Sequence, residues 1–314
     1  MNEMKSIEPD GEVYMETLEQ APFKSGFIAI IGPPNAGKST LLNRILGEKI
    51  SITSKKPQTT RNRILGVLHR PAAQFVFIDT PGIHRTDKLF NRRIVDVAIG
   101  SLGDADLILL IVDAAKSVPD AEAYLIQKLT TQKRPVILAL NKIDLMTKEA
   151  VLTCIAGWSD RYAFEAVVPV SARHGIQLDD LVSAMERLLP EGHPFFPEDA
   201  LTDAPLRFLV GELIREKVFR LTGEEIPYST AVTVDQFREA EDGEIARIHG
   251  TIHVERESQK GILIGKGGQK LRQIGETARL DIEKLLSCRV YLKIFVRVQK
   301  NWSRDTRSLR KFGY

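Results

Sequence analysis

An eight-residue stretch near the start of the chain combines glycines with a lysine and a serine, in a pattern suited to holding phosphate groups. It fits G-x-x-x-x-G-K-S, and it lies between an apolar strand pattern at 27–31 and a helical pattern from Lys38. Backbone N–H groups of such a loop, with a helix N-terminus behind them, form a concave anion site. Lys38 would add charge at the β- and γ-phosphates of a nucleotide, and the Ser39 hydroxyl would bind Mg²⁺. The predicted cradle consists of Gly32, Pro33, Pro34, Asn35, Ala36, Gly37, Lys38 and Ser39.

A second motif, Asn141-Lys142-Ile143-Asp144, selects between nucleotide bases. It directly follows the strand pattern 135–140 (PVILAL), at the end of a strand where open α/β sheets bind ligands. The Asp144 carboxylate can accept hydrogen bonds from N1 and N2 of guanine, whereas adenine would leave it facing an acceptor. The stem of Lys142 can lie over the base, and Ser171 and Ala172 at the end of a later strand could support it. The motif therefore predicts a guanine nucleotide.

Two further segments are expected to respond to the γ-phosphate. The sequence Asp79-Thr80-Pro81-Gly82 follows the strand pattern 74–78, which places Asp79 to hold Mg²⁺ and the Gly82 N–H to meet the γ-phosphate. One threonine hydroxyl in 58–62 (QTTRN) should complete the magnesium shell. A segment that contacts only the γ-phosphate loses its anchor after hydrolysis, which is the basis of a switch.

The elements that position these motifs alternate between apolar strands and helices. Strand patterns at 27–31, 74–78, 107–112, 135–140 and 167–170 are separated by helical patterns, and they predict a doubly wound, mostly parallel sheet. The expected helices are at 38–46, 91–99, 121–130 and 178–189. The alternation stops near Pro190, and the Pro-rich, acidic residues after it are expected to form a linker. We predict an acidic, mobile or weakly helical tail at 1–23, a nucleotide domain at 24–190, a linker at 191–204 and a second domain at 205–314.

The second domain is predicted to be α+β and antiparallel in character. Helices are expected at 205–221 and 269–286, and strands at 228–238, 244–256 and 290–298. Residues 259–314 contain fourteen Lys or Arg and four Asp or Glu, a net charge of +10, while the whole chain carries only +3. Such a basic end is either a solvated surface or an electrostatic footprint for phosphates.

Composition excludes several classes of protein. The two cysteines, Cys154 and Cys288, lie far apart in the sequence, so we expect neither a disulfide framework nor a cysteine metal cluster. The longest apolar run, 107–112, has six residues and is far too short to cross a bilayer. The chain opens without the pattern of a secretory signal, which favours a cytoplasmic location.

The order of the motifs resembles that of the Era family of GTPases, and the resemblance covers essentially all of residues 25–314. It implies that nucleotide contacts come from 32–39, 79–83 (including Ile83), 141–144 and 170–172, and that Thr60 rather than Thr59 binds Mg²⁺. It implies GTP and GDP as ligands and Mg²⁺ as the metal, bound by Ser39, Thr60 and Asp79. The residues expected to act in hydrolysis are Lys38, Thr60, Gly82 and Asn35.

Position 83 departs from the pattern of Ras-like GTPases, which have a glutamine there that orients the attacking water. Ile83 cannot form that hydrogen bond, so slow intrinsic hydrolysis is expected. The resemblance includes relatives in which an asparagine equivalent to Asn35 binds K⁺ and offsets the missing charge. Stimulation by K⁺ is thus one hypothesis, and a purely structural role of Asn35 in the loop is the other.

The sequence Ile264-Gly265-Lys266-Gly267-Gly268 contains a G-x-x-G motif followed by a helix with Lys270 and Arg272. Its context resembles a type II KH domain, which clamps about four nucleotides of single-stranded RNA. Glycine permits close approach of the RNA backbone, and the three cations would neutralise phosphates. The predicted RNA contacts are Ile264, Gly265, Lys266, Gly267, Gly268, Lys270 and Arg272, over an apolar floor that includes Ile262 and Leu271. Trp302, within the basic tail, could stack on bases or simply pack a surface helix.

The family resemblance implies a specific partner, and the residues leave two other functions open. It implies binding to the 3′ end of small-subunit (16S) ribosomal RNA, and a role in assembly and maturation of the 30S subunit, by a monomer. One alternative is a GTPase whose basic end meets anionic lipid, which would place it peripherally on the cytoplasmic face of the membrane. The other is a regulatory GTPase whose KH-like domain binds only protein, as in the tandem-G-domain relative Der.

Overall fold

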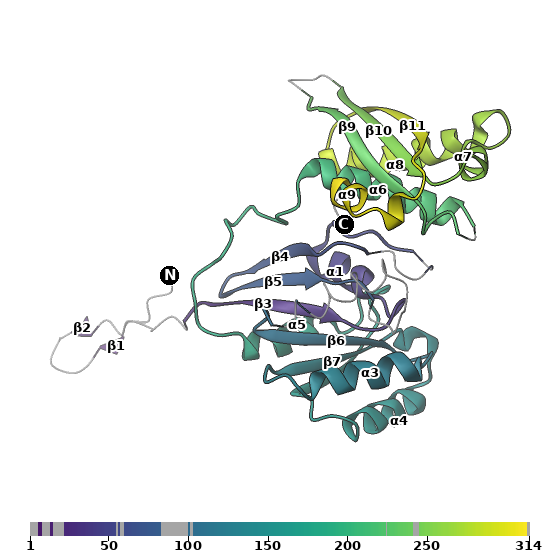
Figure 1. Cartoon of the computed structure of the whole chain (residues 1–314). Coiled ribbons are helices and arrows are strands. Elements are labelled where there is room, and N and C mark those ends of the chain that lie inside the picture. Colours follow the sequence, from purple (N-terminus) through teal and green to yellow (C-terminus); the bar gives the residue numbers. More distant parts are fainter. Residues whose placement is uncertain are drawn as a thin grey trace.

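The computed structural model describes residues 6–7, 13–14, 22–54, 56, 60–82, 100, 103–223, 225–240 and 245–312. These residues form two sheets, each with its own helices, joined by a long segment that runs past one edge of the first sheet (Figure 1). The N-terminal sheet and its helices carry the phosphate and base motifs, and the C-terminal sheet and its helices carry the G-x-x-G motif.

The N-terminal sheet has six strands in the order β4-β5-β3-β6-β7-β8. Every neighbouring pair is parallel except β4 with β5, which forms an antiparallel pair at one edge. The prediction of a mostly parallel, doubly wound sheet is confirmed; β4 and α4 were not expected. Its elements are β3 (Lys24–Ile31), α1 (Lys38–Leu46), β4 (Ile64–Arg70), β5 (Ala73–Asp79), β6 (Leu107–Asp113), α3 (Pro119–Leu129), β7 (Val136–Asn141), α4 (Lys148–Ser159), β8 (Ala166–Val170) and α5 (Leu178–Leu188). The helix expected at 91–99 lies outside the described residues.

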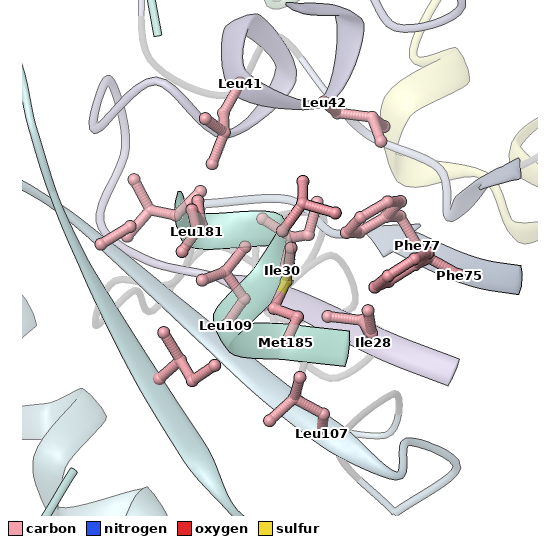
Figure 2. Close-up of a cluster of buried hydrophobic side chains, with 14 of the residues drawn as sticks. Ile28, Ile30, Leu41, Leu42, Phe75, Phe77, Leu107, Leu109, Leu181 and Met185 are labelled. Atoms are coloured by element: carbon pink, nitrogen blue, oxygen red, sulfur yellow. The ribbon is translucent and has the colours of Figure 1, made fainter. Parts of the chain in front are cut away.

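Both faces of this sheet are buried, which explains why its strands have no polar alternation. One face packs against α1 and α5, where Leu41, Leu42, Leu181 and Met185 meet inward side chains of β3, β5 and β6 (Figure 2). The other face packs against α3 and α4, whose buried side chains include Trp158. The strand ends that carry the functional motifs are therefore held by a core on each side.

The segment expected as a linker, 191–204, follows the edge of the N-terminal sheet through specific hydrogen bonds. Gln74 Oε1 accepts the backbone N–H groups of Phe195 and Phe196, and Gln74 Nε2 donates to the Phe196 carbonyl. Thr202 donates to the Leu65 carbonyl at 2.6 Å. The backbone polar groups of a proline-rich segment are in this way satisfied by the sheet edge, so the segment lies against the domain rather than away from it.

The C-terminal sheet has the order β11-β10-β9 and is covered on one face by helices (Figure 1). The expectation of an antiparallel sheet is only half right, because β9 and β10 are antiparallel but β10 and β11 are parallel. The two-helix crossover between β10 and β11 returns the chain in the same direction, which requires parallel pairing. The elements are α6 (Leu206–Leu221), β9 (Ala231–Arg238), β10 (Ala246–Val254), α7 (Glu257–Ile264), η2 (Lys266–Gly268), α8 (Gln269–Leu286) and β11 (Val290–Val298).

The two ends of the chain differ from expectation. In the acidic tail, β1 (Ser6–Ile7) pairs with β2 (Val13–Tyr14), in keeping with the strand preference of isoleucine, valine and tyrosine rather than with a weak helix. At the C-terminus, η3 (Trp302–Arg304) and α9 (Thr306–Lys311) follow β11. Trp302 is fully buried against Ala231, Leu309 and Phe312 and donates its indole N–H to the Ser229 carbonyl, so it cannot stack on bases. Among the described residues, the helices all lack the combination of length and apolarity that a membrane span requires.

Candidate nucleotide and RNA sites

The phosphate loop connects the end of β3 to the start of α1, and its conformation depends on glycine. Gly37 has φ of 103°, and a Cβ there would lie 2.2 Å from Nδ2 of Asn141. Asn141 needs that space, because its amide donates to the Ala36 carbonyl at 2.7 Å while its Oδ1 accepts the N–H of Ala172 at 2.9 Å. This one side chain ties the phosphate loop to the loop after β8, and so connects the phosphate and base parts of the site.

Lys38 lies folded over the same loop. Its Nζ donates to the carbonyls of Gly32 and Pro33 at 3.0 Å each, and the side chain is almost fully buried. Burial lowers the pKa of Lys38 to about 8, although the charge of Asp79 opposes the shift. In the described part of the chain, the hydrogen-bond acceptors of this ammonium are neutral carbonyls, and nucleotide phosphates are the anions that the loop is shaped to receive.

Three oxygen-bearing side chains converge beside Lys38. Ser39 Oγ lies 2.9 Å from Thr60 Oγ1 and donates to Asp79 Oδ2 at 2.9 Å. Asp79 is fully buried; burial raises its pKa, whereas hydrogen bonds and Lys38 oppose that rise. Its Oδ1 accepts no hydrogen bond from the described residues. An orphaned carboxylate oxygen next to two hydroxyls fits Mg²⁺, which binds through few carboxylates together with substrate phosphates.

Two residues that the sequence analysis missed hold this cluster. Ser51, which is fully buried, donates to Asp79 Oδ2 at 2.6 Å. Asn43 on α1 accepts the N–H groups of Ile50 and Ser51 and donates to the Ser51 carbonyl, so the loop that carries Ser51 is fastened to α1. Ser51 lies 28 residues before Asp79, and its local sequence contains no motif that reveals the contact.

The base motif lies at the end of β7. Lys142 has φ of 70°, and its ammonium pairs with Asp113 at the end of β6. Asp144 is oriented by Ser171, whose hydroxyl donates to Asp144 Oδ1 at 2.6 Å. The structure thus brings Asn141, Lys142, Asp144, Ser171 and Ala172 together, as expected. It adds Asp113, which sequence reasoning did not select although it ends a buried strand as Asp79 and Asn141 do.

The segment after β5 lies against the phosphate loop. Thr80 is buried and donates to the Ile30 carbonyl at 2.6 Å, and Pro81 follows it. A Cβ on Gly82 would lie 2.9 Å from the Cα of Pro34, so only glycine permits this close approach. Asn35 is exposed at the outer side of the loop. Thr59 and Ile83 lie outside the described residues.

The G-x-x-G motif forms the sharp turn between α7 and α8. Gly265, Gly267 and Gly268 all have positive φ, and a Cβ at Gly267 or Gly268 would meet no atom within 4 Å. Lys266, Gly267 and Arg272 are exposed, while Ile264, Lys270 and Leu271 are half-buried. The turn therefore leaves open space around a short run of backbone at the N-terminus of α8, with cations nearby. Ile262, one of the predicted floor residues, is 51% exposed.

One segment contacts both the nucleotide site and the C-terminal domain. The described residues within 49–61 include Thr60 of the Ser39–Asp79 cluster, and others among them touch α6 and the turn after it. Arg61 is buried and donates to the carbonyls of Pro227, Tyr228 and Thr230 at 2.8 to 3.0 Å. Lys56 donates to the carbonyls of Phe219 and Thr222 at the end of α6.

A network of charged side chains lies at the other end of this segment. Lys49 Nζ contacts Glu216 Oε2 at 2.6 Å and Asp281 Oδ2 at 2.7 Å, and Lys217 pairs with both carboxylates. Burial alone would raise the pKa of Glu216, but the hydrogen bond and charge of Lys49, with further donors, hold it below its usual value. The two domains are therefore in contact through the residues that flank Thr60.

Comparison with known proteins agrees with this geometry. The family model described as 50S ribosome-binding GTPase matches residues 27–142, and the KH domain model matches residues 225–303. GTPase Era of Geobacter metallireducens is 54% identical over 297 residues, which cover 95% of this chain and all of the relative. GTPase Era of Syntrophus aciditrophicus is 49% identical over 93% of this chain and 95% of the relative.

Two solved structures share the whole arrangement. Both have a TM-score of 0.89 and 42% identity, over 93% of this chain and 99% of theirs. One is Era in complex with MgGDPNP and nucleotides 1506–1542 of 16S ribosomal RNA. The other is a tyrosine-to-alanine variant of Aquifex aeolicus Era bound to GDP and AlF4⁻.

Proposed function

Because this chain belongs to the Era family of GTPases, we propose that it uses GTP to control the grip of its KH domain on the 3′ end of 16S ribosomal RNA, and that it thereby acts in assembly of the 30S subunit. Relatives at 49–54% identity and a solved relative that holds both MgGDPNP and this RNA support the proposal. The observation that carries it is the segment 49–61, which contacts the Ser39–Asp79 cluster and the second domain at once.

In the proposed reaction, water attacks the γ-phosphorus of GTP, the bond to the β–γ bridging oxygen breaks, and GDP and phosphate leave. Lys38 and the Gly82 N–H stabilise the negative charge that spreads over the γ-phosphoryl oxygens. Asp144, oriented by Ser171, selects guanine. Magnesium, when bound through Ser39, Thr60 and Asp79, neutralises charge on the β- and γ-phosphate oxygens. Hydrolysis is slow because Ile83 cannot orient the water.

The switch follows from the position of Thr60. In the GTP state Thr60 turns toward the metal and the γ-phosphate, and the loss of that phosphate releases it. Because Lys56 and Arg61 on either side of Thr60 hold α6 and the turn after it, any movement of Thr60 is transmitted to the KH domain. The G-x-x-G turn belongs to that domain, with its glycines open to an RNA backbone.

A binding assay with paired variants tests the proposal. The affinity of the full chain for single-stranded RNA of the 16S 3′ end is measured with GDPNP and with GDP, and the proposal requires the two affinities to differ. Gly267→Asp should weaken RNA binding by about tenfold or more, because it sets a carboxylate against a phosphate. GTP hydrolysis without RNA should stay unchanged. Gly157→Asp, on the exposed face of α4 in equally open space, is the matched control. Equal RNA affinity in GDPNP and GDP contradicts the nucleotide gate.

Three finer features belong to the same proposal. The first is that Asn35, which is exposed in the phosphate loop, binds K⁺. Equal turnover in sodium and potassium would remove this role. The second is that the protein works as a monomer in the cytoplasm.

The third is peripheral contact between the basic C-terminal residues and the inner face of the cell membrane. Vesicle flotation with and without competing RNA measures this contact.

A further inference from the structure

The sheet of the KH domain has a second face that α6 and α8 do not cover. The C-terminal residues Trp302, Leu309 and Phe312 pack over only one end of it, at Ala231 and His253. Side chains that alternate along β10 and β11 point either into the core with α6 and α8 or away from it. The outward residues lie in rows across the paired strands: Arg238, Arg247 and Tyr291; Gln236, His249 and Lys293; and Thr233, Thr251 and Phe295. We call these nine residues, together with Arg297, the outer sheet face.

Aromatic rings form a continuous row on this face. The ring centroid of His249 lies 6.5 Å from that of Tyr291 and 6.3 Å from that of Phe295, and both contacts are edge-on. Tyr291 is 51% exposed and Phe295 43% exposed. Lys293 Nζ lies 5.0 Å from the centre of the Phe295 ring. Exposed aromatic rings arranged in a row on a sheet are the kind of platform on which unpaired bases stack.

The charge of the face is suited to the phosphates that accompany those bases. Four outward residues, Arg238, Arg247, Lys293 and Arg297, are basic, and within the described part of the chain none of them forms an ion pair. An acidic group, the exposed carboxylate of Asp235, lies on the same face, so cations outnumber it there. The carboxylate of Asp235, at the register shift beside Gly250, is engaged by the hydroxyls of Thr233 and Thr251. Of the four basic residues, Lys293 and Arg297 lie on β11.

The outer sheet face adjoins the G-x-x-G site along one strand. β11 is the edge strand of the sheet, and α7, which leads into the G-x-x-G turn, packs beside it. A hollow connects the face to the start of α7, and its charged lining is mixed, with Lys260 and Arg297 beside Asp235 and Glu257. Thr251, Phe295, Val296 and Val298 complete the lining. A KH groove clamps only about four nucleotides. A longer single strand that leaves the groove past β11 meets Phe295, His249 and Tyr291 next.

We propose that the outer sheet face is a second site for single-stranded RNA, which takes nucleotides beyond those held at the G-x-x-G turn. The inference rests on the proposed RNA-binding function. A lipid surface fits less well, because interfacial contacts bury a continuous apolar face, whereas the two exposed rings here, Tyr291 and Phe295, lie among cations and polar side chains.

The test compares two RNA lengths with the full chain and GDPNP. The probes are single-stranded RNAs of about five nucleotides, which the G-x-x-G groove accommodates, and of about fifteen. The double variant Tyr291→Ala/Phe295→Ala should weaken binding of the long RNA by about tenfold or more, because it removes two stacking surfaces. Binding of the short RNA should stay within twofold. Leu152→Ala, an exposed apolar truncation on α4, is the control.

A charge variant gives an independent readout. Lys293→Gln should reduce the slope of log affinity against log salt for the long RNA by about 0.7, the value for one phosphate contact on a single strand. An unchanged salt slope for Lys293→Gln overturns the inference. So does a double variant that binds the long RNA as tightly as the unaltered protein, or one that loses affinity equally for the long and the short RNA. The inference is also overturned if these variants lose binding to anionic phosphatidylserine vesicles while they still bind the long RNA as the unaltered protein does. If Gly267→Asp leaves both RNAs bound, the proposed RNA function itself fails, which is a distinct result.

Discussion

Replacement of Ser51 by alanine should weaken magnesium binding although Ser51 is not expected to touch the metal. The Ser51 hydroxyl donates to Asp79 Oδ2 at 2.6 Å and is fully buried, so water cannot replace it. A hydrogen bond to a charged group contributes about 1.5–3 kcal/mol. Burial already raises the pKa of Asp79, and Ser51 is foremost among the groups that oppose the rise. Its loss should therefore weaken Mg²⁺ affinity by about 10- to 100-fold, as for other residues that orient a metal ligand.

The assay is the release rate of a fluorescent guanine nucleotide, measured over a series of Mg²⁺ concentrations. The half-saturating concentration should rise in Ser51→Ala and stay unchanged in Ser159→Ala, whose hydroxyl donates only to the Ile155 carbonyl of its own helix. The defect should also shrink as pH rises. A carboxyl with a raised pKa binds metal only when ionised, and more of it is ionised at higher pH. A half-saturating concentration within twofold of the unaltered protein, with the fold intact, would refute the reasoning.

Three further predictions follow from the domain contact and from Lys38. Arg61→Ala removes the donor to the buried carbonyls of Pro227 and Thr230 and to the half-buried carbonyl of Tyr228, and a buried carbonyl left unsatisfied costs about 1–3 kcal/mol, so urea should unfold the two domains separately. The chain has two tryptophans, one in each domain, and coincident fluorescence transitions from single-tryptophan variants would contradict this. Lys38, with a pKa of about 8, should take up a proton when GDP binds near pH 8.5, so GDP affinity should fall as the pH rises above 8. Calorimetry in buffers of different ionisation enthalpy measures this proton uptake, and Lys38→Met should abolish it. Lys49→Met should lower the free energy of unfolding at neutral pH, because Glu216 has a lowered pKa and its ion pair with Lys49 stabilises the fold only while Glu216 is ionised. The difference in stability from the unaltered protein should shrink as the pH falls below the usual pKa of a glutamate, and a difference that does not depend on pH in acid would refute the role.

Local motifs were accessible from the sequence because their function depends on contiguous backbone. The phosphate loop and the G-x-x-G turn place their N–H groups through the conformations of residues that adjoin in the chain, and glycine marks those conformations. The strand ends that carry Asp79 and Asn141 were predictable for a related reason. Parallel strands buried on both faces are continuously apolar, so the polar residue that ends each one stands out.

The contacts between residues that are distant in the chain were decided only by the tertiary structure. Ser51 meets Asp79, and Arg61 meets the carbonyls after α6, across sequence separations that leave no periodic or local signal. The burial of Trp302 and the exposure of Tyr291 and Phe295 are likewise results of packing, since the sequence shows which residues are aromatic but not which element covers them. The sequence by itself determined the chemistry of each site, because that chemistry is local. The connection between the sites and the second face of the KH sheet came from the fold, because only folding brings distant side chains within reach of one another.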